Sequence, residues 1–519
     1  MTPPVRPVSS ADTLNRDALA VLQPGFTGTT APDWLLRRLG EGLTSVGLFG
    51  RNVAGPEQLA ALTAQLRRER PELLIAIDEE GGDVTRLEVR GGSSFPGNHA
   101  LGAVDDTALT RAVARELGRR LADCGVNLNW APCADVNSNP DNPVIGVRSF
   151  GADPRLVARH TAAYVEGLQS AGVAACTKHF PGHGDTAVDS HHDLPRITAD
   201  AATLRARELV PFRAAVAAGT RAVMSAHLLL PTLDGERPAT LSPAVLNGLL
   251  RAPVAEGGLG FDGLIVTDGM EMRAIAATYG IERGSVLALA AGADAICVGG
   301  GPTDEDTVLR LRDALVRAVR TGELSERRLA DAAARVRALA RTPGGPDAGE
   351  RERVAPAPGI GLTAARRALR LTTAGGPYEP LTGPVHVAAF TPLANIAVGD
   401  ETPWGVAAEL TRLLPGTDTA AYTAASASAA GIPALIEGLL TAAAGRRIVA
   451  VVRDLHRHPW MAEAVTALLA ARPGTAVVEM GVPQAPPRGA LHLATHGAAR
   501  VCGLAAAEAL VGRASTHEG

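Results

Sequence analysis

Residues 176–195 carry four histidines and three aspartates directly behind the apolar run 173–176. Pro181, Gly182 and Gly184 interrupt this stretch, so its polar side chains are expected on a loop at the end of a strand. So many titratable groups on one loop indicate a chemical role. Three kinds of chemistry fit such a loop: proton transfer, metal binding and substrate binding.

Asp189 and His191 are the pair in this loop best suited to proton transfer. In an extended segment, residues two apart face the same side. The carboxylate of Asp189 can therefore bind one imidazole nitrogen of His191 and leave the other available to a substrate. A histidine oriented in this way is a general acid/base. The spacing predicts an Asp189–His191 dyad.

Two alternatives compete for the same loop. His179 and His183 are four residues apart, a spacing that binds metal when it lies on a helix. Pro181 and Gly182 disfavour a helix, so no metal is predicted. A solvated polar loop explains the hydrophilic composition, but not why Lys178 and His179 emerge together from a buried strand.

Asp268 is the best candidate for a group that works opposite the dyad. It directly follows the apolar run 263–267, and Gly269 after it permits close approach by a ligand. A helix N-cap explains an aspartate at this place equally well. The chain has no GxSxG motif, and none of its five cysteines lies in an electropositive setting. A carboxylate nucleophile is therefore favoured over a serine or cysteine.

Asp78 begins a similar acidic motif, D-E-E-G-G, after another apolar run. A carboxylate followed by paired glycines suits bidentate binding of vicinal hydroxyls, although a solvated acidic turn is an equal alternative. Arg148 adds a candidate cationic donor, with a surface arginine as its simpler explanation. These residues, with Lys178 and His179 and without a phosphate-binding glycine loop, favour a neutral polyol substrate, that is, a sugar.

The elements that must position these side chains are eight apolar, strand-like runs alternating with amphipathic helical patterns. The runs are 18–26, 45–49, 73–77, 126–130, 173–177, 222–225, 263–267 and 293–298. This alternation indicates a parallel sheet covered by helices on both faces, either an open sheet or a closed barrel. Polar residues follow the carboxyl ends of several runs, which favours a (β/α)8 TIM-type barrel, because those ends converge on one face. Those residues are Asp78, Asp135, Lys178, His227 and Asp268.

A second, smaller α/β layer domain is expected after the barrel. We assign residues 1–342 to the barrel, 343–358 to a Pro/Gly-rich linker and 359–519 to the smaller domain. Strands are expected at 385–390, 447–452, 475–480 and 491–495, and the Ala-rich tract 419–430 is expected to be a helix and its approach. No catalytic constellation is expected in this domain.

Composition limits the partners of the protein. The 519 residues carry a formal charge of −4, so nucleic acid or an anionic membrane is not expected as a main partner. Five scattered cysteines suit a reducing compartment, and no apolar run reaches the roughly 20 residues of a membrane span. A cytoplasmic protein without a cofactor is expected, and the sequence leaves its oligomeric state open.

Together these motifs resemble family-3 glycoside hydrolases, in particular the bacterial β-N-acetylglucosaminidases that trim muropeptides. The resemblance covers residues from about 18 to 340, and the K-H-F-P-G-H-G-D-T-A-V-D-S-H loop is its most specific part. The other matching motifs lie at 78–86, 139–151, 223–227 and 266–272. Gly269 and Glu79 depart from the residues most frequent in the family, which leaves subsite preference open.

The resemblance implies a retaining double displacement on a terminal β-linked N-acetylglucosamine, with a muropeptide as the expected substrate. Asp268 would form the covalent glycosyl-enzyme, and His191, oriented by Asp189, would serve as acid and then base. The residues implied to bind the sugar hydroxyls are Asp78, Arg86, Arg148, Lys178 and His179. A phosphorylase using the same site and a non-catalytic sugar-binding protein remain as alternatives.

Overall fold

The computed structural model describes residues 10–187, 194–301, 304–342, 355–392, 398 and 401–513. Within them the chain forms two compact units, each assembled from more than one stretch of sequence. The first comprises residues 1–79, 114–136 and 153–356, and the second comprises residues 80–113, 137–152 and 357–519. The domain boundaries predicted from the sequence remain a prediction. The segments 80–113 and 137–152, which follow the third and fourth strands of the first unit, belong to the second unit by their packing.

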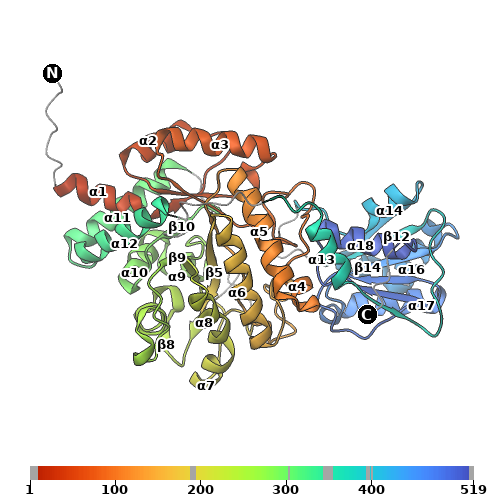
Figure 1. Ribbon diagram of the computed structural model, residues 1–519. Helices are drawn as coiled ribbons and strands as arrows, with labels where there is room; N and C mark the ends of the chain where they lie inside the picture. The colour runs from red at the N-terminus through yellow and green to blue at the C-terminus, as the bar shows by residue number, and fades with distance from the viewer. Residues whose placement is uncertain are drawn as a thin grey trace. The chain divides into compact units, whose positions relative to one another are not determined.

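The first unit is a (β/α)8 barrel of parallel strands (Figure 1). The eight strands are β1 (Leu22–Pro24), β2 (Ser45–Leu48), β3 (Leu74–Ile77), β4 (Leu128–Asn129), β5 (Ala174–Phe180), β6 (Ala222–Ser225), β9 (Leu264–Thr267) and β10 (Ile296–Val298). Six pair in the order β2-β3-β4-β5-β6-β9, a bridge from Val266 to Ala295 continues to β10, and β10 pairs with β1. β1 also packs beside β2, which completes the ring.

Each of the eight predicted runs overlaps a barrel strand, so the predicted fold class is confirmed. The first run was placed too early, because residues 18–20 end helix α1 (Ser10–Ala20) and β1 starts only at Leu22. Alternate strand residues such as Ala76, Ala174 and Val266 pack in one apolar cluster with Val336 and Leu339 of α12 (Glu326–Arg341). Small side chains at these positions fit the narrow interior of an eight-stranded barrel.

Helices cover the outside of the barrel. They are α1, α2 (Asp33–Glu41), α3 (Pro56–Glu69), α5 (Thr107–Asp123), α6 (Pro154–Ser170), α7 (Ala201–Thr203), α8 (Leu209–Ala217), α9 (Arg273–Tyr279), α10 (Ile281–Ala291), α11 (Glu305–Arg320) and α12. The π-helical turns η3 (Leu204–Glu208) and η5 (Ala244–Arg251), the 3-10 turns η1 (Gly50–Asn52), η4 (Ala239–Leu241) and η6 (Val254–Glu256), and the hairpin β7 (Leu229–Leu230) and β8 (Asp234–Pro238) complete the unit. Asp153, Asp304 and Ser325 cap α6, α11 and α12 with their side chains.

The second unit is a six-stranded sheet with apolar clusters on both faces, as expected for an α/β layer domain. Its order is β11-β16-β15-β14-β12-β13, with β11 antiparallel. The strands are β11 (Arg370–Thr373), β12 (His386–Thr391), β13 (Asp418–Thr423), β14 (Ile448–Val452), β15 (Ala476–Glu479) and β16 (Leu491–Ala494). The helices are α4 (Asn98–Val104), α13 (Ile360–Ala368), α14 (Ala407–Leu413), α15 (Ala424–Ala430), α16 (Ile432–Ala443), α17 (Pro459–Ala471) and α18 (Arg500–Leu510), with the 3-10 turns η2 (Gly146–Arg148) and η7 (Leu455–Arg457).

The four strands predicted for this region are confirmed as β12, β14, β15 and β16. The prediction of a helix and its approach over 419–430 was half correct. The first part of this tract forms the edge strand β13, and only the second part is a helix, α15. β11 was missed. Both missed strands lie at the sheet edges with mostly exposed residues, so they lack the buried apolar run by which strands are recognised.

No single described helix is both long and apolar enough to cross a membrane, whereas the bent pair α15 and α16 reaches the required length and composition together.

Candidate active site

Ionisable side chains gather where the barrel strands end. Asp78 follows β3, Lys178 and His179 lie near the carboxyl end of β5, and Asp268 follows β9. The carboxyl ends of parallel barrel strands meet on one face, which is where barrel proteins bind their ligands. All four residues belong to the first unit. The structure therefore brings together four of the predicted site residues.

Lys178 and Asp78 form an ion pair on this face, with Nζ 2.5 Å from Oδ1. The side chain of Lys178 is only 3% exposed, and that of Asp78 is 19% exposed. A buried ammonium needs such a partner, because an unpaired charge is costly to remove from water. The pair sets a hydrogen-bond acceptor and a cationic donor side by side on this face, the two kinds of group that bind hydroxyls.

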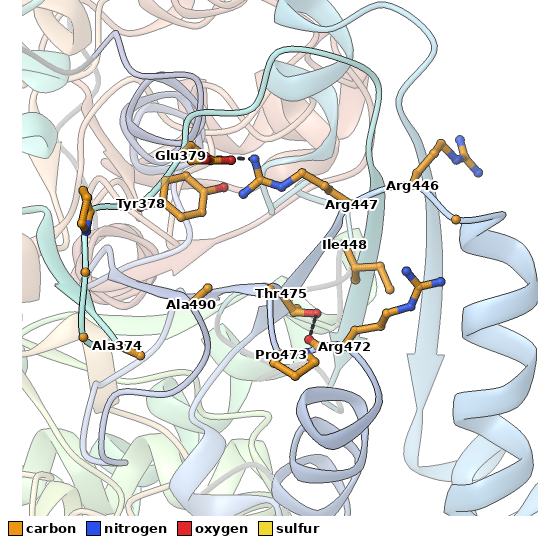
Figure 2. A pocket seen from close by; sticks show the side chains of 15 residues that line it. Ala374, Tyr378, Glu379, Arg446, Arg447, Ile448, Arg472, Pro473, Thr475 and Ala490 are labelled. Atoms are coloured by element: carbon orange, nitrogen blue, oxygen red, sulfur yellow. Dashed lines mark hydrogen bonds between the residues drawn. The ribbon is translucent and has the colours of Figure 1, made fainter.

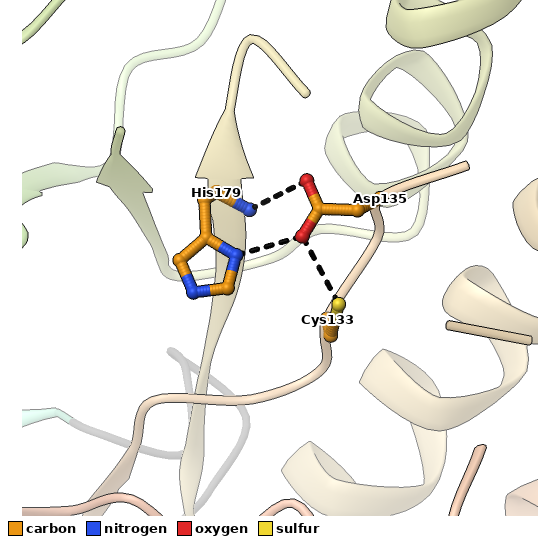
Figure 3. Close-up of side chains that lie close together, drawn as sticks. All are labelled: Cys133, Asp135 and His179. Carbon is orange, nitrogen blue, oxygen red and sulfur yellow. Dashed lines mark hydrogen bonds and ion pairs between the residues drawn. The ribbon is translucent and has the colours of Figure 1, made fainter. Parts of the chain in front are cut away.

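His179 is held by Asp135, a fully buried carboxylate that the sequence had placed only at a strand end (Figure 3). Asp135 Oδ2 lies 2.7 Å from His179 Nδ1, and it accepts the thiol hydrogen of Cys133 at 3.0 Å. Asp135 Oδ1 accepts the backbone N–H groups of His179 and His183 at 3.3 and 2.7 Å. Burial alone would raise the pKa of Asp135, but the charge and hydrogen bond of His179 hold it well below its usual range. The carboxylate thus fixes the imidazole with Nδ1 turned inward.

The same three side chains, those of Cys133, Asp135 and His179, also have the composition of a candidate metal site. Ligand atoms of Cys133, Asp135 and His179 lie within 4.8 Å of one another. Asp135 Oδ2 already accepts from both neighbours at hydrogen-bond distance, and Nδ1 of the histidine points at that oxygen. A zinc ion would need these same atoms as ligands at about 2.0–2.3 Å. The donor set therefore fits a hydrogen-bonded network that orients His179 better than a metal centre.

The stem of the histidine-rich loop, residues 181–187, packs on the π-helical turn η3, a contact that the sequence did not reveal. Arg207 bridges Asp185 of the loop at 2.6 Å and its own neighbour Glu208 at 2.5 Å. Glu208 is fully buried, and a Cβ placed on Gly182 would lie 2.7 Å from its Oε2. Only glycine at 182, which also has a positive φ, allows this close approach.

Glu208 should make stability fall as the pH rises, the opposite of a paired surface carboxylate. Burial raises its pKa from 4.5 to about 7, the nearby Asp135 and Asp185 add to this, and Arg207 opposes it. A raised pKa means that the native state binds the proton more tightly than the unfolded chain, so this stability is full below about pH 4.5 and lost as the pH passes 7. Glu208→Gln should therefore gain up to about 3 kcal/mol relative to the wild type between pH 4.5 and 8.

Urea unfolding of both proteins at a series of pH values measures this difference. Glu256→Gln removes an exposed carboxylate and provides the matched control. Parallel stability curves for the wild type and Glu208→Gln would contradict the prediction.

Asp268 is half-buried at the end of β9 and is not the N-cap of the next helix. Its Oδ1 accepts the N–H of Gly269 at 2.8 Å, while α9 begins at Arg273 with Met272 at the cap position. The cap interpretation is therefore wrong. His227 Nε2 donates to the Gly269 carbonyl oxygen at 3.0 Å, and its Nδ1 lies 2.9 Å from Thr240 Oγ1. This buried histidine fixes the peptide that follows the carboxylate.

The acidic motif after Asp78 and the predicted Arg148 are buried rather than solvated. Glu79 and Glu80 are 1% and 3% exposed, and Arg148 is 6% exposed. Within the second unit, Arg148 Nη2 and Nε bind Glu80 Oε1 and Oε2 at 2.7 and 3.1 Å. Both the solvated-turn and the surface-arginine interpretations are wrong. Arg86 also lies in the second unit and is half-buried. The predicted dyad of Asp189 and His191 lies outside the described residues.

The strand ends of this closed parallel barrel carry carboxylate, ammonium and imidazole groups. In (β/α)8-barrel enzymes the catalytic residues lie at the same strand ends. The chain therefore shares the arrangement of (β/α)8-barrel enzymes. The model of the glycosyl hydrolase family 3 N-terminal domain matches residues 33–339. The chain therefore belongs to glycoside hydrolase family 3.

Proteins of similar sequence carry names that are consistent with this family. β-Hexosaminidase A of Pseudoalteromonas piscicida is 36% identical over 317 residues, covering 56% of this chain and 52% of the relative. β-Hexosaminidase LpqI of Mycobacterium tuberculosis is 39% identical over 253 residues, covering 49% and 64%. The chain thus spans between half and two thirds of these relatives. A solved family-3 β-N-acetylglucosaminidase from Paenibacillus sp. str. FPU-7 is 34% identical, with a TM-score of 0.83 and 97% coverage of both chains.

Proposed function

We propose that the protein is a retaining, exo-acting β-N-acetylglucosaminidase. The observation that carries this proposal is Asp268, half-buried at the end of β9 on the strand-end face that also carries the Lys178–Asp78 pair and His179. Relatives named β-hexosaminidase and a solved β-N-acetylglucosaminidase of similar length support the substrate class.

In this proposal the reaction takes two displacements. Asp268 attacks the anomeric carbon, the bond to the aglycone oxygen breaks, and a proton from His191 neutralises the leaving oxygen. His191 then takes a proton from water, whose oxygen attacks the anomeric carbon and releases Asp268. Asp189 orients His191 and stabilises its charged form. These roles for Asp189 and His191 rest on sequence spacing and on the family resemblance.

The sugar is proposed to bind through the paired groups on the barrel face. Lys178 and Asp78 offer a donor and an acceptor held 2.5 Å apart, a geometry that suits adjacent hydroxyl groups. His179, fixed through Nδ1 by Asp135, is assigned to a further hydroxyl. Arg86 and Arg148 are assigned to substrate binding through the resemblance alone.

Muropeptides from peptidoglycan are the proposed natural substrates, and the cytoplasm is the proposed location. The resemblance to enzymes that trim muropeptides supports the first proposal. All five cysteines are free and buried, which supports a reducing compartment.

A panel of p-nitrophenyl β-glycosides tests this function. We expect the N-acetylglucosaminide to be cleaved at least about a hundredfold faster than the glucoside or xyloside, since a site built to bond a polar group rejects substrates that lack it. In phosphate buffer the product should be N-acetylglucosamine, initially as the β-anomer. Accumulation of a sugar 1-phosphate would instead identify a phosphorylase, and sugar binding without turnover would identify a binding protein.

A further inference from the structure

The second unit contains a cavity of about 510 Å3 at the amino-terminal edge of its parallel strands. Residues 445–448 lead into β14, residues 472–475 lead into β15, and Ala490 precedes β16. Residues 374–379, which follow the antiparallel β11, close the remaining side. Small-molecule sites in proteins span about 300–1,000 Å3, so the cavity is large enough for a ligand of sugar or nucleotide size.

This cavity and the segment 80–113 lie at opposite edges of the sheet. Asp83, in the segment 80–113, pairs with Arg453 and accepts the N–H of Ala498 at 2.7 Å. Arg453 follows β14 and Ala498 lies beyond β16, so both stand at the carboxyl edge of the sheet. The cavity lies at the other edge, and no predicted catalytic or sugar-binding residue lines it.

Two arginines in the lining are not neutralised by carboxylates among the described residues. Arg447 donates from Nη1 to the carbonyl oxygens of Glu379 and Pro380 at 2.9 and 3.3 Å, and its guanidinium stacks on Tyr378 at 5.0 Å from the ring centre. Arg472 makes neither an ion pair nor a side-chain hydrogen bond within the part of the chain that the structure describes. Guanidinium groups available in this way bind phosphate or carboxylate with paired hydrogen bonds.

The third arginine of the lining has a structural role instead. Arg446 pairs with Asp418 at 2.9 Å and points away from Tyr378 (Figure 2). The lining contains one carboxylate, that of Glu379, which is exposed. Arg447 and Arg472 therefore leave the cavity with a positive excess even when Arg446 is counted as neutralised.

The lining also offers a neutral donor and an apolar floor. The hydroxyl oxygen of Tyr378 is buried and has no hydrogen-bond partner among the described residues. Burial raises the pKa of this phenol, against the opposing charge of Arg447, so the hydroxyl stays protonated and can donate. A buried polar group without a partner is costly, and a ligand oxygen would remove that cost. Pro377, Ile448, Pro473 and Ala490 supply apolar surface beside it.

We propose that this cavity binds a small organic anion, with its phosphate or carboxylate held by Arg472 and its body against Ile448 and Tyr378. Such a site goes beyond glycoside cleavage, because it lies in the unit to which no catalytic residue is assigned. It gives that unit a binding role of its own.

Calorimetric titration of the full chain tests the proposal with three probes: glucose 6-phosphate, glucuronate and glucose. We expect saturable binding of at least one of the two anions and none of glucose. The stronger anion identifies the acid group that the site prefers. Arg472→Gln should raise the Kd of that anion about tenfold or more, as expected for loss of a charged hydrogen bond. Binding should weaken as salt is added.

Arg412→Gln is the matched control, because Arg412 is an exposed arginine of α14 paired with Glu409 outside the cavity. Gly474→Glu gives a second variant: a Cβ there meets no atom within 4 Å, so a carboxylate can enter the cavity mouth without a clash and should abolish anion binding. Both cavity variants should keep the wild-type rate on an aryl N-acetylglucosaminide, so this test is independent of the proposed activity. Absence of saturable anion binding, or equal weakening by Arg412→Gln, would overturn the proposal.

Discussion

Asp268→Ala is expected to lower kcat/KM on p-nitrophenyl β-N-acetylglucosaminide by about 10⁴-fold or more, because it removes the group that forms the covalent intermediate. The fold should survive, since Asp268 is only half-buried at the end of β9 and its Oδ1 accepts the N–H of the adjacent Gly269. The release of p-nitrophenol at pH 7 measures the loss. Normal turnover by the variant would exclude Asp268 as the nucleophile.

Azide distinguishes a lost nucleophile from a damaged site. In Asp268→Ala the removed carboxylate leaves space on the face of the sugar opposite the leaving group, and azide can attack the anomeric carbon there directly. The expected product is the α-glycosyl azide, formed together with p-nitrophenolate. Asp268→Asn fills the same space and should be inactive without rescue. Rescue of both variants, or of neither, would argue against this role.

The barrel could be predicted because its strands are short, buried apolar runs that end in polar residues. Such runs are local features, and five of the eight were placed within two residues of the observed strand at both ends. The same locality explains why Asp78, Lys178 and Asp268 were found: each follows its own run directly.

The interactions that orient these residues could not be predicted, because they join positions far apart in the chain. Asp135 is 44 residues from His179, and Glu80 is 68 residues from Arg148. Glu208 looks like an ordinary polar residue in an Arg-Ala-Arg-Glu helical segment, and its burial beside Gly182 arises from a tertiary contact. Burial and pairing of charges depend on tertiary packing. The hydrophobic periodicity of a sequence gives no information about such contacts.

The membership of one segment in a compact unit also depends on distant contacts. Residues 80–113 follow a barrel strand but belong to the second unit, where Asp83 binds Arg453 and the N–H of Ala498. Each of these contacts spans more than 300 residues, with separations of 370 and 415. A linker can be recognised from composition, whereas composition does not show to which compact unit a long loop belongs.

Asp135→Ala is expected to destabilise the barrel by about 3–5 kcal/mol and to lower kcat/KM by about a hundredfold. The substitution leaves the buried N–H groups of His179 and His183 and the ring of His179 without their acceptor, and the cost of such orphaned groups is large. Activity falls because an imidazole that is free to rotate no longer presents Nε2 to the substrate.

The pH dependence separates the charge of Asp135 from its shape. Its pKa is lower in the folded state, so its stabilising effect is full above the ordinary aspartate value and is lost as the pH falls toward the lower native pKa. Asp135→Asn keeps the shape and one acceptor oxygen but not the charge. The difference in unfolding free energy between the wild type and Asp135→Asn should therefore stay constant from pH 8 to about 5 and shrink below about 4. A difference that grows on acidification would show that the carboxylate is not held ionised by His179, and the proposed orientation of that imidazole would have to be abandoned.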